Sequence, residues 1–194
     1  FYGKNEGRWI TSSFYRDSLP SWVQQYNQSG FADEYVKQWD LLYDASNYTE
    51  SDEDNSPYEQ LLKGKKAPVF PYDLEALKSQ NDGYSIISET PYGNTMTTDF
   101  AIKAIQNEAL GQDEITDFLT VSYSSTDYIG HNFGVNSIEI QDTYLRLDQD
   151  IARLLSFLDN QVGANEYTLY LTSSHSIGKC YVISNRCIGS KSQS

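Results

Sequence analysis

Two histidines and one aspartate carry the chemistry that this sequence offers. Asp127 and His131 stand four residues apart, so one helical turn places both side chains on the same face. A carboxylate and an imidazole in that arrangement provide two of the four ligands that zinc prefers. His175, the other histidine of the chain, is a third candidate ligand if the fold brings it opposite this pair. We therefore interpret Asp127, His131 and His175 as a metal site.

A hydrolase also needs a nucleophile or an activated water. Five serines surround the predicted site, but none lies in a recognisable nucleophile motif, and serines beside strand ends usually form turns: Ser122, Ser124, Ser125, Ser173 and Ser174. The chain has no Walker-type glycine loop and no dinucleotide fingerprint. We expect no catalytic nucleophile among these residues, so the residues alone indicate half of a metal site.

Three segments would position the predicted ligands. Residues 118–123 and 167–172 have the apolar and aromatic composition of strands. Residues 137–160 repeat apolar positions at helical spacing: Ile140, Tyr144, Leu147, Ile151, Leu154 and Leu158. Strand, helix and strand predict a right-handed βαβ unit, and ligands of parallel sheets bind beyond the strand ends, where both histidines fall. We predict an α/β fold with a mostly parallel sheet flanked by helices.

The first 90 residues are less regular, and we expect them to form a cap-like insertion. Short helices are predicted near residues 20–28 and 33–38. Residues 45–56 are rich in Asn, Ser, Thr and acid but lack the fixed spacing of a calcium loop, so we expect a solvated loop. A longer helix begins near Asn94 and stops at Gly111. Residues 91–175 would then form the α/β segment with the metal site, and residues 176–194 an unfamiliar tail.

Composition excludes some classes of function. The chain of 194 residues carries 14 Lys and Arg against 27 Asp and Glu, a formal net charge of −13, which disfavours binding to nucleic acid. No apolar run approaches the roughly 18 residues of a membrane span. Cys180 and Cys187 could pair or remain free thiols, and their spacing is not typical of zinc sites.

Several runs of this sequence resemble the alkaline phosphatase superfamily, in the branch of bacterial monoesterases related to nucleotide pyrophosphatases and phosphodiesterases. The most specific run reads Asp-Tyr-Ile-Gly-His at 127–131 and continues through Gln-Asp-Thr-Tyr-Leu-Arg-Leu-Asp at 141–148. Residues 11–15, 19–23, 90–95 and 167–173 agree with the same branch. The likeness covers about residues 1–175 and implies an alkaline phosphatase-like fold.

The resemblance also implies a chemistry. Members of this family hold two zinc ions around the substrate phosphate, which activate a Thr or Ser nucleophile. Asp127 and His131 match two ligands of one zinc, and His175 matches a ligand of the other. These enzymes are typically periplasmic or exported, and their substrates are small phosphate esters.

Two departures from the family pattern limit that reading. The Asp expected before His175 is Ser174 here, and a hydroxyl is a poorer zinc ligand than a carboxylate, so at most one zinc should be well held. The remaining ligands and the nucleophile of the family would lie outside these residues. We therefore expect an incomplete, central-to-late segment with little turnover by itself, prone to self-association or accompanied by a complementary chain.

Three functions stay open at this point. The first is zinc-dependent hydrolysis of phosphate monoesters. The second is hydrolysis of phosphodiesters or nucleotide pyrophosphates by the same machinery. The third is a non-catalytic, truncated relative that binds a ligand or partner. Likeness to the monoesterases places the first ahead.

Overall fold

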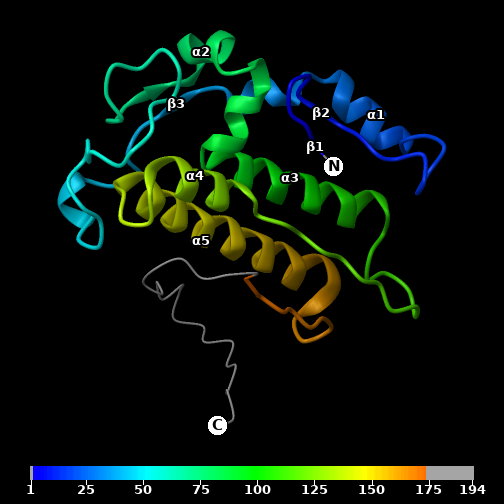
Figure 1. Ribbon diagram of the computed structural model, residues 1–194. Helices are drawn as coiled ribbons and strands as arrows, with labels where there is room; N and C mark the ends of the chain where they lie inside the picture. The colour runs from blue at the N-terminus through cyan, green and yellow to red at the C-terminus, as the bar shows by residue number, and fades with distance from the viewer. Residues whose placement is uncertain (1, 174–194) are drawn as a thin grey trace.

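The computed structural model describes residues 2–173. Four longer α-helices dominate it: α1 (Ser21–Gln28), α3 (Tyr92–Asn107), α4 (Ser125–Phe133) and α5 (Ile138–Leu158). A short helix α2 (Leu74–Leu77), four 3₁₀ segments (Phe31–Tyr35, Ala45–Asn47, Lys78–Gln80 and Gly83–Glu89) and a π-turn (Asp159–Gly163) complete the helical elements. Figure 1 shows α3, α4 and α5 in one layer, with α1 and α2 on the far side of α3 from α5.

Strands within the described residues are short. β1 (Tyr2–Gly3) pairs antiparallel with β2 (Arg8–Trp9), and β3 (Gln38–Trp39) pairs antiparallel with β4 (Tyr72–Asp73). In the second pair Trp39 lies opposite Tyr72. Both rings are fully buried and contact Phe70 and Phe133, which makes this small sheet the centre of an aromatic core.

The predicted parallel sheet is not confirmed. Residues 118–123 and 167–172 carry no strand in the part of the chain that the structure describes, and the two sheets found there are antiparallel. Several apolar side chains of these segments face solvent, including Phe118 at 90% and Tyr170 at 87% exposure. The composition of both segments favours strands, but a strand forms only when a neighbour accepts its backbone hydrogen bonds.

The helices follow the sequence more closely. The helix expected at residues 20–28 is confirmed as α1, and that expected at 137–160 as α5, which begins where the Ser137 hydroxyl accepts from the Ile140 N–H. The helix predicted from Asn94 begins at Tyr92, with Pro91 at its N-cap. The segment expected as a helix at 33–38 is a 3₁₀ turn at Phe31–Tyr35.

Helix α5 buries more than its apolar stripe. Ile140, Leu147 and Leu154 are buried as the periodicity predicts. Three acids on the same helix are buried too: Glu139, Asp142 and Asp150. Each therefore needs a partner within the protein, because an unpaired buried carboxylate is costly.

Asp142 has the fullest set of partners. Its Oδ2 accepts from Trp39 Nε1 at 2.7 Å and from Arg146 Nε at 2.6 Å. Its Oδ1 accepts from the Leu42 backbone N–H at 2.8 Å and from the Tyr48 hydroxyl at 2.5 Å. This carboxylate ties β3 and the chain after it to α5, across about one hundred residues of sequence.

The division into a segment of residues 1–90, a segment of 91–175 and a tail stays a prediction. One hydrophobic core draws on both of the first two segments, with Trp39 and Leu74 from one and Ile129 and Ile140 from the other.

Candidate metal site on helix α4

Helix α4 presents two opposite faces. Ile129 and Phe133 are fully buried, and Phe133 contacts the Trp39 and Tyr72 rings edge-on. Asp127 and His131 lie at the alternate helical positions and point away from that core. The helix is therefore held by its apolar side while the two predicted ligands remain accessible.

The beginning of α4 is fixed by α3. Asn94 of α3 accepts from the Ser125 backbone N–H at 3.2 Å and donates to the Thr126 hydroxyl at 3.1 Å. Gly93 leaves room for this approach, since a Cβ at that position would stand 2.1 Å from Ser125 Oγ. Gly93 and Asn94 both belong to α3. The packing of α3 against α4 therefore positions the first turn of α4, which contains Asp127.

The end of α4 is held by the loop that follows residue 48. The Gln60 backbone N–H donates to the Asn132 carbonyl at 2.7 Å, and the Gln60 side chain donates to the His131 carbonyl at 3.4 Å. Nearby, the Asp52 N–H donates to the Asn136 carbonyl at 2.7 Å. These hydrogen bonds from the loop therefore help to hold the backbone of His131, and with it the imidazole, in place.

The structure brings two of the three predicted ligands together. Asp127 Oδ1 lies 3.6 Å from His131 Nε2, with 45% and 70% of the respective side chains exposed. Two ligands of one tetrahedral zinc, each bound at about 2.1 Å, stand roughly 3.4 Å apart. The spacing and the donor types therefore fit two corners of a zinc site. His175 lies outside the described residues.

Two of the nearby serines, Ser122 and Ser124, contact each other. The Ser122 and Ser124 hydroxyls lie 3.2 Å from each other and are exposed. Among the described residues neither hydroxyl hydrogen-bonds to a histidine or a carboxylate, which is what activation of a serine would need. Ser174 lies outside the described residues.

Sequence reasoning missed an acidic cluster close to this site. Asp54 lies in the loop expected to be solvated, Glu59 follows that loop, and Glu139 comes from the first turn of α5, with one oxygen of each within 4.8 Å of the others. Burial raises the pKa of all three carboxyls, that of Glu139 to about 8. Within the loop expected to be solvated, Asp54 Oδ1 is buried. No short sequence motif indicates the cluster, because its members lie up to 85 residues apart.

No helix among residues 2–173 is both long and apolar enough to cross a bilayer.

Comparison with known proteins identifies relatives of this chain. A family model described as type I phosphodiesterase / nucleotide pyrophosphatase matches residues 6–191. A protein of Myroides odoratus named calcium-transporting ATPase is 53% identical over 172 residues, which are 87% of this chain and 31% of that protein. Alkaline phosphatase PafA of Elizabethkingia meningoseptica is 44% identical over 176 residues, covering 90% of this chain and 32% of its own.

A solved structure agrees with these relatives. The crystal structure of wild-type alkaline phosphatase PafA superimposes with a TM-score of 0.81 at 46% identity, covering 86% of this chain and 32% of that chain. The described residues therefore take up an arrangement found in an alkaline phosphatase. The chain spans about a third of the length of the curated relatives it matches.

Proposed function

The chain belongs to the type I phosphodiesterase / nucleotide pyrophosphatase family, and from that premise we propose that it supplies zinc ligands to a phosphate monoester hydrolase. The observation that carries the proposal is the pair Asp127 and His131, 3.6 Å apart on the exposed face of α4. The likeness to alkaline phosphatases supports monoesters as the substrate class. Two relatives of this chain are named alkaline phosphatases.

In this proposal Asp127 and His131 hold one zinc ion. When bound, zinc supplies positive charge that stabilises the oxygens of a transferring phosphoryl group. His131 must present an unprotonated Nε2, because a protonated imidazole nitrogen has no lone pair for a metal. Ile129 and Phe133 fix the helix so that both ligands keep their separation when the metal leaves.

The second zinc of the family is proposed to be weak here. The resemblance assigns His175 to it, and Ser174 stands where a carboxylate ligand is expected. We therefore propose one well-held zinc. The resemblance likewise supports a periplasmic or exported location, a small phosphate ester as substrate, and association with itself or with a complementary chain.

Hydrolysis of phosphodiesters is the second candidate, favoured by the description of the matching family. Turnover of p-nitrophenyl phosphate against bis-p-nitrophenyl phosphate by the full-length gene product distinguishes the two. A higher kcat/KM for the monoester supports the proposal, and a higher value for the diester replaces it.

Zinc content is the direct test of the site, because it does not depend on a nucleophile. After dialysis against a weak chelator, elemental analysis should find about one zinc per chain, and Asp127→Asn or His131→Gln should lose it. Asp148→Asn is the matched control, since Asp148 is a half-buried acid of α5. Zinc retained at full stoichiometry in both ligand variants would refute the assignment.

A further inference from the structure

The acidic cluster of Asp54, Glu59 and Glu139 is built from two distant parts of the chain. Asp54 and Glu59 belong to the loop that lies beside α4, and Glu139 to the first turn of α5. One carboxylate oxygen from each lies within 4.8 Å of the other two. Oxygens bound to one Ca²⁺ at 2.3–2.6 Å can stand at most about 5 Å apart, so one ion could contact all three.

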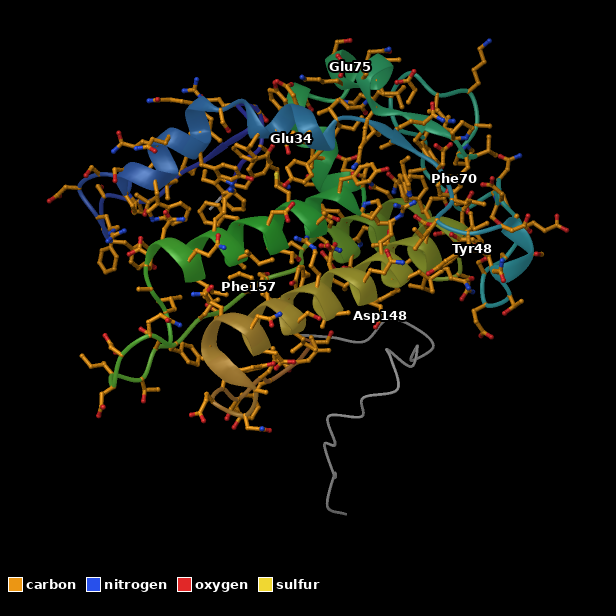
Figure 2. All side chains as sticks on the ribbon, turned by 180° about the vertical axis from the view of Figure 1, so that it is seen from behind. Glu34, Tyr48, Phe70, Glu75, Asp148 and Phe157 are labelled. Atoms are coloured by element: carbon orange, nitrogen blue, oxygen red, sulfur yellow. The ribbon has the colours of Figure 1, made fainter. Side chains whose placement is uncertain are left out.

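Each carboxylate uses one oxygen within the protein. Glu139 Oε1 accepts from the Tyr72 hydroxyl at 2.5 Å, Asp54 Oδ2 from the Phe70 N–H at 3.2 Å and Glu59 Oε2 from the Ser56 N–H at 2.8 Å. These three donors orient the carboxylates. Figure 2 labels Phe70, whose backbone N–H is the donor to Asp54.

The second oxygen of each carboxylate has no partner. Glu139 Oε2, Asp54 Oδ1 and Glu59 Oε1 are all buried, and none has a hydrogen-bond partner among the described residues. Glu139 is decisive, because its side chain is fully buried and its free oxygen cannot reach water. A buried acceptor left in this state is costly, and three together call for a cation or a proton.

The local charge suits a divalent ion. The ionised cluster carries three negative charges, and the Lys65 ammonium acts on both Asp54 and Glu139. Lys65 itself is engaged by the carbonyls of Val69 at 2.6 Å and Pro71 at 2.8 Å. One lysine leaves a net charge of about −2, which a divalent cation neutralises.

From these observations we propose that Asp54, Glu59 and Glu139 form a binding site for Ca²⁺. Ca²⁺ fits better than Mg²⁺, because it accepts irregular all-oxygen sites, whereas Mg²⁺ loses its waters reluctantly and the three free oxygens are buried. Ca²⁺ also fits better than zinc, which prefers nitrogen and sulfur ligands. The ion would link the loop that contains Asp54 and Glu59 to α5. It would thereby stabilise the same loop that hydrogen-bonds to the backbone at His131 and Asn132.

This site is independent of the proposed phosphatase activity, and binding measures it directly. Tb³⁺ replaces Ca²⁺ in oxygen sites and emits when a nearby tyrosine is excited, and the Tyr72 hydroxyl contacts Glu139. After treatment with EGTA, the chain should show tyrosine-sensitised Tb³⁺ emission that excess Ca²⁺ displaces. Glu139→Gln should weaken Ca²⁺ binding at least tenfold while its amide oxygen still accepts from Tyr72.

Two further variants make the test specific. Glu59→Gln should also weaken Ca²⁺ binding, whereas Glu53→Gln, at an exposed acid of the same loop, should not. In thermal unfolding, 1 mM CaCl₂ should raise Tm by about 5 °C or more over EGTA in the wild-type chain and in Glu53→Gln, with a much smaller rise in the cluster variants. Circular dichroism confirms that each variant is folded.

Three results would overturn the proposal. Absence of a Ca²⁺ effect in the wild-type chain would show that a proton alone occupies the cluster. An equal effect of Mg²⁺ would refute the selectivity. An unchanged effect in Glu139→Gln would place the ion elsewhere, for example at Asp127 and His131.

Discussion

Replacing Asp142 by asparagine should strongly destabilise this fold. The carboxylate is fully buried and accepts four hydrogen bonds, two at each oxygen. Asparagine has nearly the same shape but only one acceptor oxygen. Whichever way the amide is turned, its NH₂ faces two donors that previously had an acceptor.

The magnitude follows from those lost acceptors. A buried donor left without an acceptor costs about 1–3 kcal/mol. Two of the four donors lose less than this. The Tyr48 hydroxyl can rotate and accept instead, and the Arg146 side chain is 19% exposed and also donates to the Asp40 carbonyl. We therefore take values near the lower end of the range for the two donors that lose their acceptor. We expect a loss of about 3 kcal/mol in the free energy of unfolding. For a chain of this length that lowers Tm by about 6–12 °C.

Thermal unfolding by circular dichroism and urea titration measure this loss. The control is Asp148→Asn, the same change on the same helix, at a half-buried acid that Figure 2 labels on α5. A double-mutant cycle with Trp39→Phe should give a coupling energy of at least about 0.5 kcal/mol, because Trp39 Nε1 donates to the lost oxygen. A Tm change in Asp142→Asn no larger than in Asp148→Asn would refute the reasoning.

Two further predictions concern α3 and α5. Gly93→Ala should lower the free energy of unfolding by about 1–2 kcal/mol despite the better helix propensity of alanine, because its Cβ would stand 2.1 Å from Ser125 Oγ and 2.9 Å from the Ile87 carbonyl. Urea unfolding checks this, and Gly93→Ala combined with Ser125→Ala should recover part of the loss; an alanine variant as stable as the parent would contradict the close contact. Burial raises the pKa of Asp150 above its usual range, against the opposing effect of Arg153, so the folded chain keeps a proton that the unfolded chain releases as pH rises above about 4. The free energy of unfolding, relative to that of Asp150→Asn, should therefore fall as pH rises above about 4. Urea titrations of both proteins between about pH 4 and 7 measure this. The same pH dependence in both proteins would show that the carboxyl titrates normally.

The sequence by itself determined the parts of this protein that depend on neighbours along the chain. Apolar spacing and the Ser137 cap located α5, and the four-residue spacing of Asp127 and His131 placed both on one face of a helix. These features follow from local backbone geometry, which needs no knowledge of the remaining fold. The same spacing supported a zinc site, and the runs around it indicated the family.

Tertiary structure alone decided which polar groups are buried and which strand-like segments pair. Asp54 looked like one more acid in a solvated loop, yet it lies beside Glu139, 85 residues further along the chain. Asp142 sits in a helix whose pattern does not show that Trp39, 103 residues earlier, will donate to it. Residues 118–123 have strand composition, yet they carry no strand in the described part of the chain. Burial and strand pairing depend on partners distant in sequence, and local propensity contains no information about where those partners lie.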